Sequence, residues 1–431
     1  MTTSDPPRIL PAAETFTLAN GLKIGVIPNR HAPVVSSALW YRAGTRDEAP
    51  EHVGTAHFLE HMMFKGAERF GPGEIDRVTR ALGGSNNAFT GHDATAYYFT
   101  FAADRWQRAL EIEVDRMTAL ALEPHEVDSE RQVILEEIAM YEGEPWDALE
   151  IAVLAEFYGR NSYGRPVLGT RESLARIDGG VLRHFHQRCY RPANAVLSVV
   201  GDVDPASVAR QAEDVFARVE SGHPIVAPSE ADGRPTALKR LVRHQGEVPR
   251  LLAALAAPAG DDADHPLLRL LLTVLASGRS SRLHRRLVDE GQLCVWVSAD
   301  LGEQINPGAA ILAAELVPGV EPQDVEDILL EELEDLGRRP PTATEVERAK
   351  HVYFADWVFG HETVEQQALL LGAALSLFDA DHPWRHLHQL RTAGLETVQD
   401  AARRLFGPGR LFGPNMRGVI GWSLPQRAHD V

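Results

Sequence analysis

The chain has 431 residues, enough for two or more domains with large cores. Its 43 lysines and arginines stand against 61 aspartates and glutamates, and the net charge of −18 argues against nonspecific binding to nucleic acid or to an anionic membrane. Only 2 cysteines occur, which excludes a disulfide framework or a cysteine-rich zinc site and fits a reducing compartment. With no apolar leader and no run of about 18 apolar residues, we expect a cytoplasmic protein without a membrane span.

Strands and helices alternate along the first half of the chain. Residues 16–27 and 34–44 are predicted strands, with a turn at Asn20 and Gly21. Residues 85–101 are rich in β-forming residues and predict a hairpin. Helices are expected at about 72–82, 103–120 and 124–142, and a buried strand at 194–205.

The order of elements restarts after a polar, proline-bearing stretch at 221–235. Residues 250–278 predict a strand, a loop and a buried helix, and residues 417–426 predict a closing strand. A loose match between any two segments of mixed structure is the alternative explanation. We predict an α+β fold built as an internal repeat, in which each domain is a mainly antiparallel sheet packed with helices. The predicted ranges are 1–222 for the first domain, 223–236 for a linker and 237–431 for the second domain.

The stretch HFLEHMMFKG, residues 57–66, places two histidines and a glutamate in an otherwise apolar helical turn. His57 and His61 are four residues apart and share a helix face, with Glu60 beside them. Buried polar groups need partners, and a zinc ion would satisfy both imidazoles. A hydrogen-bonded pair of core histidines is the alternative.

A catalytic zinc site needs a third protein ligand. Glu137 lies within the apolar face that we expect for the helix at 124–142, which makes it the predicted ligand. Glu130, one heptad earlier on the same face, is predicted to accept a hydrogen bond from a ligand histidine and to orient it. Glu136 falls towards the polar side. Five apolar residues define the expected face: Val133, Ile134, Ile138, Met140 and Tyr141.

These motifs resemble those of the insulinase/pitrilysin (M16) zinc peptidases. The similarity rests on the inverted His-x-x-Glu-His motif with its downstream glutamate, on NNAFT at 86–90, YGRPVLG at 163–169 and VVGDVDP at 199–205. It spans essentially the whole chain and is nearest to the short two-domain members that resemble the β-subunit of the mitochondrial processing peptidase. In that family two pairs of α+β domains close as a clamshell around a peptide, so this chain would form one half.

The resemblance implies a role for each matched residue. His57, His61 and Glu137 would bind Zn²⁺, Glu60 would be the catalytic base, and Glu130 would be a further catalytic residue beside the metal. Asn87, Ala88 and Phe89 match the edge strand along which the substrate backbone pairs. The implied activity is hydrolysis of peptides or unfolded segments by a zinc endopeptidase.

One departure from the family pattern concerns an arginine and a tyrosine, seven apart, that active members contribute from the opposite half of the clamshell. Val288 and Val295 occupy those positions here. We therefore expect a heterodimer with a second M16-like chain that supplies the arginine and the tyrosine. The alternatives are a homodimer, in which one of three arginines stands in, and a non-catalytic zinc-binding or scaffold subunit. The three arginines are Arg282, Arg285 and Arg286.

Overall fold

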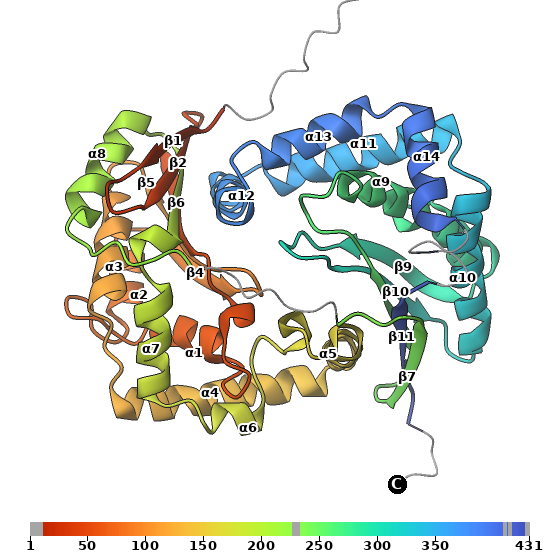
Figure 1. Cartoon of the computed structure of the whole chain (residues 1–431), viewed down its shortest axis with the longest axis horizontal. Helices are drawn as coiled ribbons and strands as arrows, with labels where there is room; N and C mark the ends of the chain where they lie inside the picture. The colour runs from red at the N-terminus through yellow and green to blue at the C-terminus, as the bar shows by residue number, and fades with distance from the viewer. Residues whose placement is uncertain (1–11, 226–232, 408–411, 413–415, 427–431) are drawn as a thin grey trace, which may run out of the picture. The chain divides into compact units, whose positions relative to one another are not determined.

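The computed structural model describes residues 12–225, 233–407, 412 and 416–426. The chain divides into two compact units, and neither is continuous in sequence (Figure 1). The first unit comprises Met1–Glu137, Arg165–Ser229 and Val358–Pro383. The second comprises Ile138–Gly164, Glu230–Trp357 and Trp384–Val431. Within the described ranges, no helix combines the length and the apolar character that crossing a bilayer demands.

The first unit is built on a six-stranded sheet of order β1-β2-β6-β3-β5-β4. Strands β2 and β6 are parallel, and all the other neighbours are antiparallel. Between β1 and β2 the chain turns at Asn20 and Gly21, where Gly21 has a φ of +90° that only glycine adopts readily. The strands are β1 (Glu14–Thr17), β2 (Lys23–Pro28), β3 (Val34–Tyr41), β4 (Ser85–Thr90), β5 (Thr95–Ala102) and β6 (Ala195–Gly201).

Helices cover both faces of this sheet. Helix α12 (Val364–Leu377) comes from the second half of the sequence and packs on β3 and β6. Its Leu371 and Leu375 join Trp40 in a buried cluster, and Ser198 Oγ donates to the carbonyl of Ala368 over 2.8 Å. The other helices of the unit are α1 (Thr55–Met62), α2 (Glu74–Ala81), α3 (Gln107–Thr118), α4 (Pro124–Gly143), α6 (Arg171–Leu174), α7 (Gly179–Cys189) and α8 (Pro205–Phe216); α4 continues into the second unit after Glu137.

The second unit has a five-stranded sheet of order β7-β11-β8-β10-β9, with β7 and β11 parallel and the other neighbours antiparallel. Helix α5 (Pro145–Tyr158), from the first half of the sequence, packs on β8 and β11 through Leu149 and Val153. The strands are β7 (Leu238–His244), β8 (Arg250–Ala256), β9 (Cys294–Leu301), β10 (Ala309–Leu316) and β11 (Gly418–Leu424). The other helices are α9 (His265–Ala276), a π-helix at His284–Glu290, α10 (Pro322–Arg338), α11 (Ala343–Gly360), α13 (His382–Thr392) and α14 (Leu395–Phe406); α11 belongs to this unit up to Trp357 and α13 from Trp384.

The two sheets share one topology, because β7, β11, β8, β10 and β9 follow the order of β2, β6, β3, β5 and β4. This confirms the predicted α+β repeat. The contiguous ranges 1–222 and 237–431 differ from the structural units, because α5 and α12 each complete the unit of the other sequence half. Each sheet has a second apolar face, and the helix that covers it is supplied by the opposite half. Part of the predicted linker, 226–232, lies outside the described residues.

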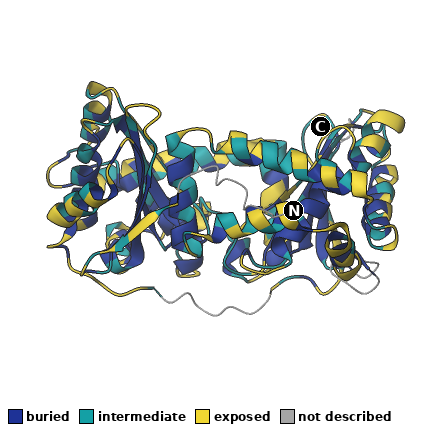
Figure 2. Cartoon of the chain, turned by 90° about the horizontal axis from the view of Figure 1, so that it is seen from above, coloured by how far each residue is buried: buried dark blue, intermediate teal, exposed yellow. Residues whose placement is uncertain are grey.

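Burial follows this layering. The inner strands of both sheets are largely buried, whereas the edge strands β1, β4, β7 and β9 and one side of many helices are more exposed (Figure 2). An extensive core cluster belongs to the second unit and includes most of α9. The first unit buries more polar groups beside its sheet, among them the pair Glu113 and Arg116.

Candidate metal centre

Helix α1 carries both histidines of the motif and is fixed at its start by a buried glutamate. Glu48 follows a 3-10 turn at Thr45–Asp47, and its two carboxylate oxygens accept the backbone N–H groups of Gly54, over 2.9 Å, and Ala56, over 2.7 Å. These are donors that a helix N-terminus otherwise leaves unpaired. Burial raises the pKa of Glu48 to about 8 even though both N–H groups oppose the rise.

The three predicted ligands converge. Nε2 of His57 lies 3.8 Å from Oε2 of Glu137, and Nε2 of His61 lies 3.6 Å from the same oxygen. One ligand atom from each residue lies within 4.8 Å of the other two. With metal–ligand bonds of about 2.0–2.1 Å, ligand atoms around a tetrahedral zinc are about 3.3 Å apart. The two separations from Glu137 exceed this spacing by a few tenths of an ångström, and the residues fit zinc.

A glutamate and a lysine hold His61 in place. Nδ1 of His61 lies 2.8 Å from Oε1 of Glu130, and Nζ of Lys65 lies 2.5 Å from the other oxygen of Glu130. Burial would raise the pKa of Glu130, but the hydrogen bonds to His61 and Lys65 outweigh it and lower that pKa. Burial by itself would lower the pKa of His61, but the hydrogen bond to Glu130 and the charges of the neighbouring carboxylates together outweigh burial, and the pKa of His61 is raised. Glu130 therefore stays ionised, which turns Nε2 of His61 towards Glu137.

His57 has no such support from the described residues. Its Nδ1 is buried and has no hydrogen-bond partner among them. Burial, followed by the neighbouring His61, lowers the pKa of His57 to about 3, so the imidazole is neutral at pH 7. A neutral imidazole is the form that binds a metal.

Glu60 lies beside the ligands and is held by a residue that the sequence analysis did not single out. Oγ1 of Thr90, the last residue of β4, donates to Oε2 of Glu60 over 2.6 Å. Burial raises the pKa of Glu60, and the hydrogen bond from Thr90 only partly offsets that rise. Thr90 could have been identified from the sequence because it is the final residue of the NNAFT motif. Lys65 was also missed, although it lies one helical turn after His61.

The predicted substrate residues lie on the outermost strand of the first sheet. Strand β4 pairs with β5 and has no second partner among the described strands. The backbone N–H of Ala88 donates to the side-chain oxygen of Asn87 over 2.9 Å. Phe89 is 38% exposed and packs edge-on against Trp40. Because Thr90 ends this strand at Glu60, the open edge leads directly to the ligand cluster.

The apolar face expected for α4 was wrong in part. Val133 and Met140 are 45% and 64% exposed, and the buried residues of the helix are instead Val127, Glu130, Ile134 and Ile138. The buried stripe is narrower than the predicted one because only a single helix face meets α1 and its surroundings. Glu137 lies at the border of this stripe, and its side chain is 26% exposed rather than fully buried.

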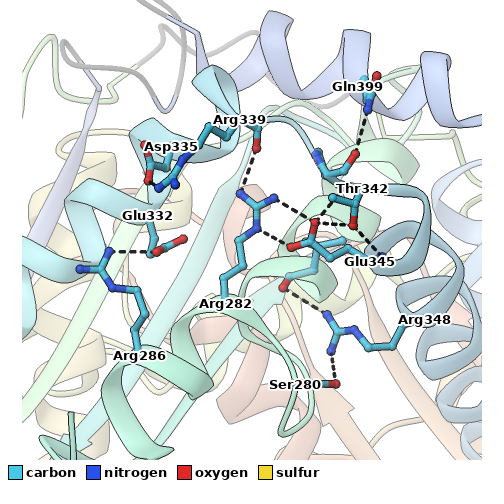
Figure 3. A network of polar contacts seen from close by, with 12 residues as sticks. Ser280, Arg282, Arg286, Glu332, Asp335, Arg339, Thr342, Glu345, Arg348 and Gln399 are labelled. Carbon is cyan, nitrogen blue, oxygen red and sulfur yellow. Dashed lines mark hydrogen bonds and ion pairs between the residues drawn. The ribbon is translucent and has the colours of Figure 1, made fainter. Parts of the chain in front are cut away.

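The three candidate stand-in arginines lie in the second unit. Arg282 binds Glu345 through Nε and Nη2, over 2.7 and 3.1 Å (Figure 3). Arg286 binds Glu332 and Glu331, over 2.9 and 2.8 Å. Both guanidinium groups are thus engaged within their own unit. Arg285 is exposed and pairs with Glu290 over 3.2 Å.

The two valines that stand where active family members have arginine and tyrosine differ in their exposure to solvent. Val295 is the second residue of the outer strand β9 and is 56% exposed, whereas Val288 packs against the core of the second unit. Neither side chain can donate a hydrogen bond.

Comparison with known proteins places this geometry in a family. Residues 25–171 match the family model described as Insulinase (Peptidase family M16), and residues 176–353 match the one described as Peptidase M16 inactive domain. An uncharacterized zinc protease of Mycobacterium tuberculosis is 31% identical over 433 residues, covering 98% of this chain and 97% of that protein. A probable β-subunit of the mitochondrial processing peptidase of Arabidopsis thaliana is 28% identical over 275 residues, covering 62% of this chain and 52% of that protein.

A solved structure has the same fold as this chain. The crystal structure of a protease from Helicobacter pylori superposes with a TM-score of 0.88 at 23% identity, covering 96% of this chain and 100% of that one.

Proposed function

The chain belongs to the insulinase family of peptidases, family M16, and from that premise we propose that it is a zinc-dependent endopeptidase. Its substrates would be peptides or unfolded segments, bound in a chamber closed by a second chain. The observation that carries the proposal is the convergence of His57, His61 and Glu137 beside a glutamate with a raised pKa. A pair of core histidines would need no carboxylate at this distance from both rings.

Each residue at the centre has a chemical task. A zinc ion held by His57, His61 and Glu137 would supply a Lewis acid and lower the pKa of a bound water to near neutral. Thr90 engages Oε2 of Glu60, which leaves Oε1 as the atom that accepts the proton of the attacking water and returns it to the leaving amine. The raised pKa of Glu60 makes it a stronger proton acceptor than an exposed glutamate.

Substrate binding is assigned to the open edge of β4. An extended peptide that adds to this edge pairs through its main chain and needs no particular side chains. Since β4 ends at Thr90, the peptide would be guided towards Glu60. Asn87 would release the N–H of Ala88 to the incoming chain.

Replacing Glu60 by glutamine tests the proposal. Glu60→Gln preserves shape and the hydrogen bond from Thr90 but cannot accept a proton, so we expect zinc content to be unchanged and peptide hydrolysis to fall by about 10²–10⁴-fold. Glu136→Gln, an exposed glutamate on α4, is the matched control and should retain the wild-type rate. A Glu60→Gln enzyme that hydrolyses a quenched fluorescent peptide at the control rate would place the base elsewhere.

We further propose that the active enzyme is a heterodimer. Val288 and Val295 offer no donor for the oxyanion, and Arg282 and Arg286 are held by glutamates of their own unit. A partner of the same family with arginine and tyrosine at these positions would complete the centre. One such donor is worth about 10²–10³ in rate.

The partner proposal is tested by measuring hydrolysis with the isolated chain and after addition of such a partner. We expect the isolated chain to be folded, zinc-loaded and at least about 10²-fold slower. Full activity of the isolated chain, abolished by Arg285→Ala or Arg286→Ala, would favour the homodimer. No hydrolysis with any partner would favour a scaffold subunit.

A further inference from the structure

We propose that the second unit holds its own binding site for a zinc-like dication, formed by His265, Glu303 and His386. His265 is the first residue of α9, His386 lies on α13, and Glu303 lies in the segment between β9 and β10. One ligand atom from each residue lies within 4.8 Å of the other two. Nδ1 of His386 is 3.1 Å from Oε1 of Glu303, close to the separation of about 3.3 Å expected between ligands of a tetrahedral zinc.

The surroundings of His265 prepare it as a ligand. Its ring is fully buried, and Nε2 lies 3.1 Å from the carbonyl oxygen of Gly302. That contact keeps the proton on Nε2 and leaves the lone pair on Nδ1, which has no hydrogen-bond partner among the described residues. A metal-binding histidine characteristically donates its other ring N–H to a backbone carbonyl in this way. An imidazole lone pair buried without a partner is costly unless a cation or a water meets it.

Two neighbours oppose a cation and set the expected affinity. Arg269, one turn further along α9, donates to the carbonyl of Leu301 and brings a positive charge near His265. The N-terminus of α9 adds a partial positive charge. Glu303 is the only carboxylate in the triad, and its side chain is 40% exposed. We therefore expect the site to bind zinc more weakly than the centre on α1 and to fill only when free zinc is supplied.

The site would stabilise structure rather than perform hydrolysis. Its ligands come from α9, α13 and the β9–β10 connection, which are far apart in sequence and would be tied together by one ion. No glutamate comparable to Glu60 takes part, since the only carboxylate of the triad is itself a ligand. A bound cation should therefore raise the melting temperature of the protein without changing its hydrolytic rate.

The experiment starts from the full chain with the first centre removed by His57→Leu and His61→Leu. Titration of this variant with Co²⁺ should give visible d–d absorption that saturates at one equivalent, and Zn²⁺ should displace the Co²⁺ and raise the melting temperature. Adding His386→Gln should weaken binding by at least about tenfold, as loss of a direct ligand implies. His388→Gln, on the exposed side of the same helix, is the matched control and should bind as before.

Glu303→Gln provides a second variant that preserves shape at a partly exposed position, so that a folding defect in His386→Gln cannot obscure the result. It should also lose the Co²⁺ spectrum while keeping the circular dichroism of the parent. Absence of any bound equivalent in the first-centre variant would overturn the proposal. Retention of that equivalent in both His386→Gln and Glu303→Gln would overturn it as well.

Discussion

Helices α1 and α9 hold the same place in the two sheets, each following the strand that pairs with the closing strand of its unit. Helix α9 is rich in leucine and is almost wholly buried in the core cluster of the second unit. Helix α1 uses the same position to bury His57 and to hold Glu60 and His61 beside it. The fold therefore does not depend on the metal ligands. They replace apolar contacts that the other copy retains.

Burying these groups costs stability. The unpartnered Nδ1 of His57 loses a hydrogen bond to water and gains none from the described residues, a penalty of about 1–3 kcal/mol. Leucines at comparable depth in α9 contribute to stability instead. The first unit thus contains a locally unfavourable arrangement of buried polar groups. An ion that binds to the folded state would offset this loss of stability.

The largest effect is expected from making α1 more like α9. His57→Leu should abolish zinc binding at the first centre and peptide hydrolysis with it, because two protein ligands seldom retain a catalytic ion. The zinc-free variant should nevertheless melt at or above the temperature of zinc-free wild type, since the unpartnered imidazole is gone. Elemental analysis measures the zinc content, and calorimetry in the presence of a chelator measures the melting temperatures of the zinc-free proteins. A variant that melts well below zinc-free wild type would mean that the fold itself needs His57.

The second effect concerns the residue that orients His61. Glu130→Gln keeps size but removes the charge that pairs with Lys65 and fixes the proton on Nδ1. We expect the zinc affinity of the first centre to fall by about 10–100-fold, as for other residues that support a ligand. Competition with a chelating dye gives the affinity. Glu136→Gln, the exposed neighbour on α4, should bind zinc normally, and equal affinities in the two variants would remove Glu130 from the site.

A smaller effect should distinguish the open edge of β4 from an ordinary surface strand. The backbone N–H of Ala88 donates to the side chain of Asn87. In an antiparallel edge strand, the backbone N–H and C=O groups of every second residue point away from the neighbouring strand. Ala88→Pro removes this donor and should raise KM by about 3- to 10-fold, the value of one hydrogen bond, with little loss of melting temperature. Ala88→Thr keeps the N–H and is the control. A large drop in melting temperature with unchanged KM would make this segment purely structural.

The last effect concerns acid sensitivity in the polar first unit. Burial lowers the pKa of His186 to about 4. The unfolded chain takes up this proton near pH 6.5, so the stability that His186 contributes is lost as the pH falls from about 6.5 towards 4, by about 2 kcal/mol at pH 5. His186→Gln can still donate to the carbonyl of Arg116 but does not titrate.

That variant should therefore lose a few degrees less than wild type between pH 7 and pH 5, measured by thermal melts with a chelator present. Equal losses in the two proteins would show that His186 does not contribute to the acid sensitivity.

Local patterns in the sequence predicted much of this molecule. The hairpin at 85–101 has Gly91 in its turn and forms β4 and β5. The repeat predicted from strand, helix and closing strand corresponds to the shared order of the two sheets. These features depend on residues close together in the chain, whose periodicity and turn chemistry are readable without the fold.

Features that depend on distant contacts could not be predicted in the same way. The face of α4 was drawn too wide, because periodicity cannot tell an apolar residue at the border of a stripe from a buried one, and Val133 and Met140 are exposed. The link from Thr90 to Glu60 joins residues 30 apart and needs the register of β4. The engagement of Arg282 by Glu345 spans 63 residues and carries no motif.

The exchange of α5 and α12 has a consequence for how the protein is made on the ribosome. The six strands of the first sheet are complete once Gly201 has been synthesised, yet α12, which covers β3 and β6, begins only at Val364. At typical elongation rates the intervening residues take roughly ten to thirty seconds to emerge. During that interval the apolar face around Trp40 lacks its covering helix, so a nascent chain stalled near the linker is the form most exposed to chaperones, proteases and aggregation.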